Sequence, residues 1–313
     1  MTLRPQGTKA RTRTRSATRL AGFVLLAVLL SGCGETRSAY QYRWDIFVNS
    51  IFRPDGLILS AVWLTLWISV VSQVIGVVLG VFGAVGRLAR FWPARWLANF
   101  YVWFFRGTPL LVQISFIYFG LGVAGVYGWP PLDIGPVTIK GAVQAGIVAL
   151  GVNEGAYMTE IVRAGILAID PGQMEAAKSL GMTYRKAMTR IVLPQAARVI
   201  IPPLGNEFNN MLKTTSLLVI LGNVPELYVT FSRKNASGPT VFHPFELFLA
   251  AAVWYLLLTT VWSIIQGMIE RRIGRGYGSG GEQPGLRARL LGLSRSRDGE
   301  TAALGGPSIG QGR

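Results

Sequence analysis

Long runs without charged side chains dominate the middle of this sequence. Leu57–Val85 contains 29 consecutive uncharged residues, Gly107–Tyr127 contains 21 and Leu247–Ile269 contains 23. Because about 20 apolar residues in a helix cross the roughly 30 Å hydrocarbon core of a bilayer, each run is long enough to span a membrane. A buried helix of a soluble protein is usually shorter than this, so the pattern predicts transmembrane helices.

A fourth apolar segment, Ala142–Val162, is interrupted by polar residues. Asn153, Tyr157 and Glu160 recur at the i, i+4, i+7 spacing that places side chains on one face of a helix. Glu154 adds a carboxylate beside this polar stripe. The segment therefore predicts a membrane helix whose polar face contacts protein or water rather than lipid.

A fifth segment, Val199–Ile220, shows the same kind of polar face. It begins near Pro202-Pro203, which we expect to break a helix. The polar positions that follow are Asn206, Glu207, Asn210 and Lys213. A charge at the bilayer centre costs about 2.5–3.5 kcal/mol on insertion scales. Two interpretations stay open: these side chains line a pathway, or they hydrogen-bond neighbouring helices and only hold a bundle together.

The first 33 residues form a separate module. Six basic residues precede a short apolar stretch, Leu20–Leu30, and small residues lead to Cys33. This pattern is typical of a secretory signal peptide, and Leu30–Cys33 resembles the lipobox of bacterial lipoproteins. Two interpretations stay open. Either the segment is cleaved and Cys33 is lipidated, or the segment is not cleaved and is a short sixth apolar helix or an upstream extension of the chain. Residues 34–56 then form an external stretch.

The basic residues are unevenly distributed along the predicted topology. The chain has 31 Lys and Arg against 15 Asp and Glu, a formal charge of +16, yet charged residues make up only 15% of it. If the five spans alternate, 24 of the 31 basic residues lie inside and six outside. This positive-inside asymmetry predicts a membrane protein with a cytoplasmic C-terminus and no nucleic-acid partner. The longest inside loop is 163–198, and the Gly- and Ser-rich tail, 273–313, is expected to be disordered, cytoplasmic and able to touch membrane lipid.

No segment predicts catalysis by this chain. One His and one Cys make a zinc site improbable, and the phosphate-binding pattern GxxxxGK[ST] is absent. No segment brings together a nucleophile, a base and an orienting group. We therefore expect no metal, no bound cofactor and no ATP site of its own.

The long inside loop instead predicts two short capped helices. Asp170 followed by proline begins a helix that we expect over Pro171–Leu180. Gly181 supplies the left-handed residue that ends it. Thr183 can cap a second helix, which Pro194 is expected to stop.

The residues of this loop carry a family resemblance. Their pattern and spacing resemble the "EAA" loop of permease subunits in bacterial ATP-binding-cassette importers; the matching residues are Glu175, Ala176, Ala177, Gly181, Ile191, Leu193 and Pro194. Other stretches are similar to the polar amino acid branch of that family: Arg106–Gln113, Ala156–Arg163, Pro194–Ala196, Lys213–Leu217 and Glu226-Leu227. The resemblance covers about 57–272.

The resemblance implies an all-α membrane protein with the five-helix core of the type I importer transmembrane domain. It also implies a place in the bacterial inner membrane, with the N-terminal side of the core external, and a second permease subunit that is either a copy or a different chain. ATP is used by separate ATPase subunits, and an external solute-binding protein delivers an amino acid. Glu175 is then a polar anchor, Gly181 the turn, and Ala176 with Ala177 the face that packs on the ATPase.

One departure from the family pattern concerns the substrate. Asn153-Glu154-Gly155 stands where family members mostly carry small residues. Glu154 either faces the pathway, where it favours a cationic amino acid, or pairs with Lys213 and is structural. Two rival functions also stay open: an ion-coupled carrier or channel that uses the intramembrane acids without an ATPase, and a lipid-anchored scaffold.

Overall fold

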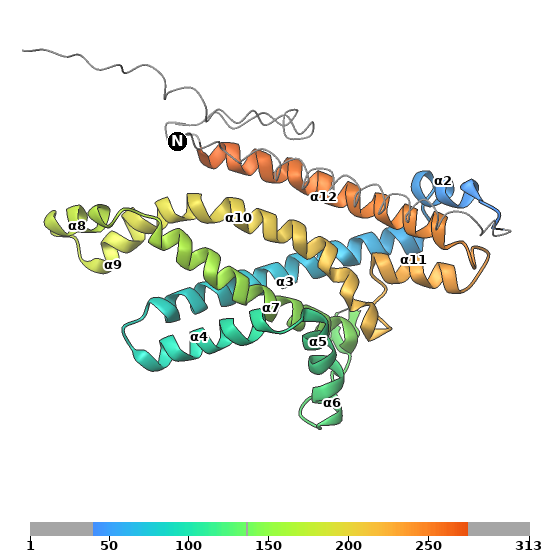
Figure 1. Ribbon diagram of the computed structural model, residues 1–313, viewed down its shortest axis with the longest axis horizontal. Helices are drawn as coiled ribbons and strands as arrows, with labels where there is room; N and C mark the ends of the chain where they lie inside the picture. The colour runs from blue at the N-terminus through green and yellow to red at the C-terminus, as the bar shows by residue number, and fades with distance from the viewer. Residues whose placement is uncertain (1–39, 136, 275–313) are drawn as a thin grey trace, which may run out of the picture. The chain divides into compact units, whose positions relative to one another are not determined.

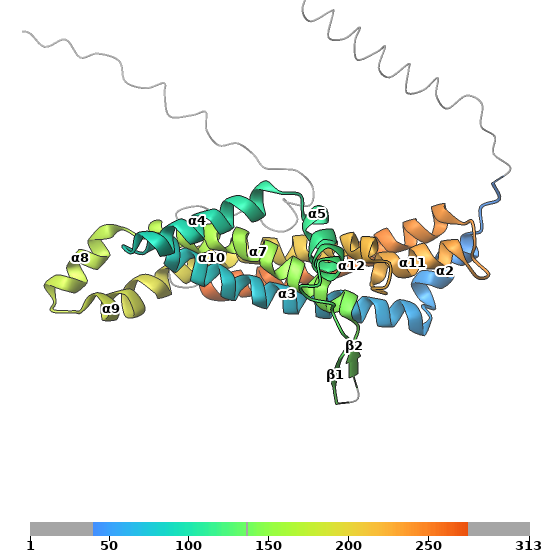
Figure 2. The ribbon, with the colours of Figure 1, turned by 90° about the horizontal axis from the view of Figure 1, so that it is seen from below.

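The computed structural model describes residues 40–135 and 137–274, most of which are helical (Figures 1 and 2). The predicted signal segment, Cys33 and the tail beyond Gly274 lie outside these residues. The helices are α2 (Trp44–Phe52), α3 (Gly56–Leu88), α4 (Trp92–Gly107), α5 (Leu110–Ser115), α6 (Leu121–Val123), α7 (Gly141–Leu167), α8 (Pro171–Ser179), α9 (Tyr184–Ala187), α10 (Leu193–Thr214), α11 (Leu227–Ala236) and α12 (Pro244–Gly274). Two π-helical turns, Phe116–Gly120 and Met188–Val192, and a 3-10 helix, Thr215–Leu221, extend them.

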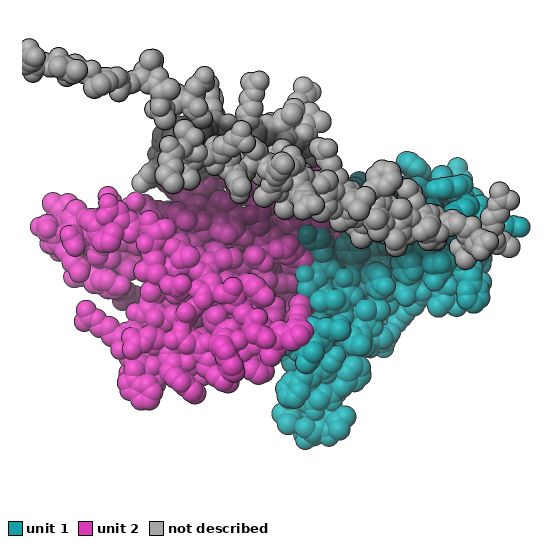
Figure 3. All heavy atoms as spheres, in the orientation of Figure 1, with its two compact units in different colours: residues 1–71, 111–149, 212–257 teal, residues 72–110, 150–211, 258–313 magenta. Residues whose placement is uncertain are grey.

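The chain divides into two compact units (Figure 3). Of the described residues, unit 1 comprises 40–71, 111–135, 137–149 and 212–257, and unit 2 comprises 72–110, 150–211 and 258–274. The four long helices α3, α7, α10 and α12 each contribute residues to both units. Unit 2 contains the predicted inside loop and most of the predicted polar stripes.

The two longest apolar runs form single long helices, as predicted. By length and composition, α3 and Pro244–Ile273 of α12 can each cross a membrane, with mean hydropathies of 2.2 and 2.0. A third span is possible if α4 and Leu110–Val123 act as one broken span.

The prediction of one continuous span over Gly107–Tyr127 is wrong. Thr108-Pro109 interrupts the chain between α4 and α5, because proline disfavours helical geometry in the residue before it. Thr108 is accordingly extended, with φ −114° and ψ 145°. The preceding segment, for which the sequence predicted no span, is the helix α4.

Proline does not stop either helix where the sequence predicted a break. Pro194 lies in the first turn of α10, directly after the π-helical turn Met188–Val192. A wider turn tolerates a residue without an N–H group, so the chain continues from α9 into α10. Pro202 and Pro203 also lie inside α10. Side chains of α12 bond to carbonyls of that stretch: Gln266 donates to the Pro202 carbonyl at 3.2 Å.

A stripe of glycines lets α3 and α7 approach closely within unit 2. A Cβ atom added at Gly76 would lie 2.8 Å from the Glu154 Cβ, and one added at Gly80 would lie 2.9 Å from the Met158 carbonyl carbon. Gly83 continues this stripe one turn later. Close packing of small residues is how membrane helices gain van der Waals contact. The stripe therefore fixes the position of Glu154 relative to α3.

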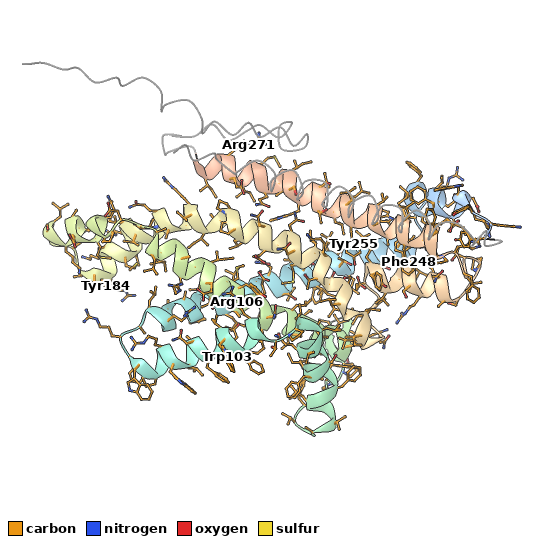
Figure 4. The ribbon with its side chains drawn as sticks, viewed as in Figure 1. Trp103, Arg106, Tyr184, Phe248, Tyr255 and Arg271 are labelled. Atoms are coloured by element: carbon orange, nitrogen blue, oxygen red, sulfur yellow. The ribbon has the colours of Figure 1, made fainter. Side chains whose placement is uncertain are left out.

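Unit 1 is organised around a buried carboxylate. Glu226 is 0% exposed and caps α11, accepting hydrogen bonds from the Tyr228 and Val229 amides at 2.9 and 2.8 Å. The Tyr255 hydroxyl of α12 donates to the same carboxylate at 2.9 Å (Figure 4). The Leu227 amide donates to Thr65 of α3 at 3.1 Å. These bonds join α3, α11 and α12.

Asp55 holds the start of α3 in the same unit. Its carboxylate accepts a hydrogen bond from the Ile58 amide at 3.0 Å and forms an ion pair with Lys234 of α11. Burial raises the pKa of Asp55, but the Lys234 ammonium and the Ile58 amide outweigh burial and leave this pKa lowered.

A short β-hairpin was not predicted from the sequence. Strands β1 (Leu132–Ile134) and β2 (Val137–Ile139) pair antiparallel, with Leu132 opposite Ile139. Figure 2 shows the hairpin extending away from the start of α7. It joins α6 to α7 and leaves the helical class unchanged.

Candidate functional site

The first helix of the inside loop begins as the sequence predicted. The Asp170 side chain caps α8 by accepting a hydrogen bond from the Gly172 amide at 2.8 Å, and Pro171 occupies the first helical position. Both features lower the free energy of a helix start, because they satisfy or remove an unpaired N–H group. The capping prediction at Asp170 is confirmed.

The turn that follows is also confirmed. Gly181 has φ +78°. Its amide donates to the Lys178 carbonyl at 2.9 Å, and the Met182 amide donates to the Ala177 carbonyl at 3.1 Å. This pair of bonds is the Schellman arrangement that closes a helix with a left-handed residue. Thr183 then caps α9 by accepting from the Lys186 amide at 3.4 Å.

The loop is a closed structural element with an exposed outer surface. Figures 1 and 2 show α8 and α9 side by side at the ends of α7 and α10. Gln195 of α10 donates to Gln173 of α8 at 3.3 Å. Ala177 is only 4% exposed, whereas Glu175 and Ala176 are exposed. Of the two alanines predicted to pack on a partner, only Ala176 is therefore accessible on this chain.

The other residues of the loop motif lie in the π-helical turn after α9 and at the start of α10. Ile191 is half-buried in the π-helical turn, and Leu193 and Pro194 are exposed at the start of α10. On the outer surface, the Lys178 ammonium lies 5.9 Å from the centre of the Tyr184 ring, which Figure 4 labels. The loop thus presents an acid, a small residue and a cation with an aromatic ring.

A buried carboxylate without an ion-pair partner lies deeper in unit 2. Glu154 is 6% exposed, and its Oε1 has no hydrogen-bond partner among the described residues. Gln73 of α3 and Glu207 of α10 both lie close enough to act on the charge of Glu154. Within the described part of unit 2, neither glutamate forms an ion pair. Two carboxylates without a cation make this region suited to a positively charged group.

The rest of the predicted stripe on α7 has three different environments. Asn153 is 8% exposed, and its amide donates to the Phe105 carbonyl of α4 at 3.1 Å. Glu160 is ion-paired with arginines of α3 and α7. Tyr157 is 36% exposed. Of these three side chains, Tyr157 is the most accessible.

The predicted stripe on α10 is more exposed. The Asn206 side chain accepts a hydrogen bond from Gln266 of α12 at 3.1 Å. Glu207 is half-buried, and Asn210 and Lys213 are exposed. Lys213 belongs to unit 1 whereas Glu154 belongs to unit 2, so their pairing stays a prediction.

The chain matches a known family over most of its described length. The family described as "Binding-protein-dependent transport system inner membrane component" matches residues 76–275. The chain belongs to this family. Its match contains the α8–α9 loop and both polar stripes. Membership makes the chain a membrane-embedded transport subunit and does not favour a carrier that acts alone.

Relatives and solved structures agree with this family. The arginine transport system permease protein ArgU of Corynebacterium glutamicum is 35% identical over 280 residues, 88% of this chain and 86% of ArgU. The probable glutamine ABC transporter permease protein GlnM of Bacillus subtilis is 39% identical over 230 residues, 74% of this chain and 99% of GlnM. A chain from a crystal structure of an amino acid ABC transporter with histidines is 36% identical, with a TM-score of 0.63, covering 74% of this chain and 100% of that one. The predicted type I importer fold is thus confirmed.

Sequence reasoning missed several residues of this family member's polar region. Gln73 reaches Glu154 from α3, and Arg87 and Arg106 reach Glu160 from α3 and α4. Gln73 carries the only amide side chain in the run Leu57–Val85, and that signal could have identified it. In the sequence the two arginines counted only among the basic residues on the inside. Their convergence on Glu160 depends on the packing of α3 and α4 against α7, which no local sequence pattern contains.

Proposed function

We propose that this chain is the permease subunit of an ATP-driven amino acid importer in a bacterial inner membrane. Family membership and the names of its relatives support an amino acid as the substrate. The observation that carries the proposal is the capped, exposed α8–α9 loop. Because the loop is capped at Asp170 and Thr183 and closed at Gly181, a displacement of a partner bound to it can be transmitted to the helices that it joins.

In this proposal the α8–α9 loop docks on a separate cytosolic ATPase subunit. Glu175 and Ala176 lie on its exposed surface, where a polar anchor and a small packing residue would meet a partner. Closure of the ATPase then moves α7 and α10, the two helices that the loop joins. The chain itself binds no cofactor and hydrolyses no ATP, and a second permease subunit completes the pathway.

The proposed substrate carries a positive charge. Glu154 and Glu207 form an acidic pair without a cation among the described residues of unit 2, and a guanidinium or ammonium group would neutralise it. Glu154 is buried in this conformation, so substrate would reach it when the helices separate during transport. An external solute-binding protein delivers the amino acid to the side of the membrane that carries the β1–β2 hairpin.

Reconstitution tests this function directly. The chain is co-purified with its ATPase subunits, placed in liposomes and supplied with ATP, its binding protein and radiolabelled L-arginine or L-glutamine. We expect uptake of at least one amino acid only when ATP and the binding protein are both present. Uptake by the chain alone under an ion gradient would contradict the proposal.

Glu154→Gln tests the substrate class. We expect this change to lower uptake of L-arginine by about tenfold or more, because one hydrogen bond to a charged group is worth roughly 1.5–3 kcal/mol. Uptake of L-glutamine should change little. Glu154→Asp, which keeps the charge, and Glu270→Gln, which removes a carboxylate from α12, are the controls. Equal loss of both amino acids in Glu154→Gln would show a structural role instead.

A further inference from the structure

Three arginines converge on a single carboxylate in unit 2. Glu160 of α7 forms an ion pair with Arg87 of α3 through Oε1, and its Oε2 lies 3.0 Å from Arg163. Arg106 of α4 lies 3.6 Å from Oε1. Three cations and one anion leave a net charge of +2 in this cluster.

Arg106 is the least engaged member of this cluster. Its distance to Glu160 is the longest of the three, and its side chain is 43% exposed, against 21% for Arg87 and 32% for Arg163. A guanidinium carries five N–H donors. The guanidinium carbon of Arg106, a residue labelled in Figure 4, lies 5.2 Å from the centre of the Tyr157 ring. Arg106 therefore keeps charge and donors for another partner.

The position of Arg106 on α4 directs it toward α7 rather than lipid. Ala98, Val102 and Arg106 follow each other at intervals of four residues, and Ala98 and Val102 are buried. The aromatic side chains Trp96 and Trp103 are 62% and 70% exposed, and they occupy other positions around the helix. A lipid phosphate is therefore less suited to Arg106 than a ligand inside the protein.

Tyr157 lies between opposite charges on α7. Glu154 precedes it by three residues, which is about 4.5 Å along a helix, and Arg106 reaches its ring from α4. An α-amino acid carries a carboxylate and at least one cationic group only a few bonds apart. A carboxylate on the Arg106 side and a cation on the Glu154 side would each meet the opposite charge.

We propose that Arg106 binds the α-carboxylate of the transported amino acid beside Tyr157. This inference rests on the proposed amino acid import. Arginine suits the role because its planar guanidinium pairs with a carboxylate through two parallel hydrogen bonds. Glu160 positions the guanidinium, and Arg87 and Arg163 keep the charge of Glu160 compensated. The proposal explains why three arginines gather at one acid whose charge a single arginine would balance.

The test measures binding to the purified permease–ATPase complex in nanodiscs, without the solute-binding protein, which would impose its own selectivity. Two matched pairs of probes differ only in the α-carboxylate: L-arginine with agmatine, and L-glutamine with 4-aminobutanamide. For wild type we expect the carboxylate-bearing probe of at least one pair to bind about tenfold or more tightly than its partner. Arg106→Met should remove this preference by weakening that probe alone, and Arg106→Lys should restore part of it. Arg95→Met, on the same helix, is the control and should keep the preference.

Each outcome separates this inference from the function on which it rests. A preference that survives Arg106→Met would overturn the carboxylate site while leaving amino acid import intact. Equal weakening of both probes would show that Arg106 only supports the fold. An effect confined to nanodiscs that contain anionic lipid would assign Arg106 to a lipid phosphate and also overturn the inference. Absence of ATP-dependent uptake of any amino acid in the reconstitution would overturn the proposed function itself.

Discussion

Gly181→Val is expected to abolish ATP-dependent uptake while the subunit still inserts into the membrane. Gly181 adopts φ +78°, which a β-branched residue strongly disfavours. If valine makes the native turn unfavourable by roughly 2 kcal/mol, the turn is populated only a few per cent of the time relative to its alternatives. The hydrogen bonds that close α8, from the Gly181 and Met182 amides, are then lost. ATPase-coupled uptake in proteoliposomes and co-purification of the ATPase measure the result.

Gly181→Asn is the matched control for this change. Asparagine is larger than glycine but tolerates the left-handed conformation. It should therefore retain most of the uptake that valine removes. Size-exclusion profiles in detergent check that both variants insert and fold. Normal uptake with Gly181→Val, or equal losses with valine and asparagine, would show that the backbone conformation at this turn does not matter for coupling.

The loop that carries this prediction could be derived from the sequence because its determinants are local. Asp170 and Thr183 cap helices within three residues of themselves, and Gly181 acts through its own φ angle. None of these features depends on a distant segment. The long helices α3 and α12 were also predictable, since length and absence of charge are sufficient to define a span.

The errors arose where neighbouring structure changes a local preference. Pro194 and Pro202 were expected to end helices, but a π-helical turn precedes the first, and Gln266 of α12 bonds to the carbonyl of the second. α4 was overlooked because Arg95 and Arg106 leave only ten uncharged residues between them, too few to predict a span. Thr108-Pro109 divided a run that composition alone treated as continuous.

The polar region was predicted only in part for a related reason. The period of α7 identified Asn153, Tyr157 and Glu160, with Glu154 beside them, because they share a helix. It could not identify the partners of these residues, which come from α3 and α4 more than 45 positions away. Which carboxylate is neutralised and which is left without a cation is decided by packing between helices. Glu160 is neutralised by arginines of neighbouring helices, whereas Glu154 has no cation beside it among the described residues of unit 2.

Packing between α3 and α7 gives the second large expected effect. Gly80→Ala should destabilise the protein by about 1–3 kcal/mol, the usual cost of overpacking a filled interior. The added Cβ would overlap the Met158 side chain and lie 2.9 Å from its carbonyl carbon, and Met158 is 0% exposed. Since the backbone of α7 must move to make room, side-chain rotation alone cannot relieve the contact. Thermal unfolding in detergent, followed by tryptophan fluorescence, measures the loss.

Gly56→Ala separates this steric effect from the general preference of alanine for helices. Gly56 begins α3 and has nothing within 4 Å of an added Cβ, so alanine there should leave the unfolding temperature unchanged or slightly higher. The same crossing places Gly76 against Glu154. A shift of α7 caused by Gly80→Ala would therefore also move the proposed cation site, and the surviving protein should lose uptake of L-arginine more than its stability alone explains. If Gly80→Ala and Gly56→Ala unfold at the same temperature, the close crossing of α3 and α7 does not exist in the folded protein.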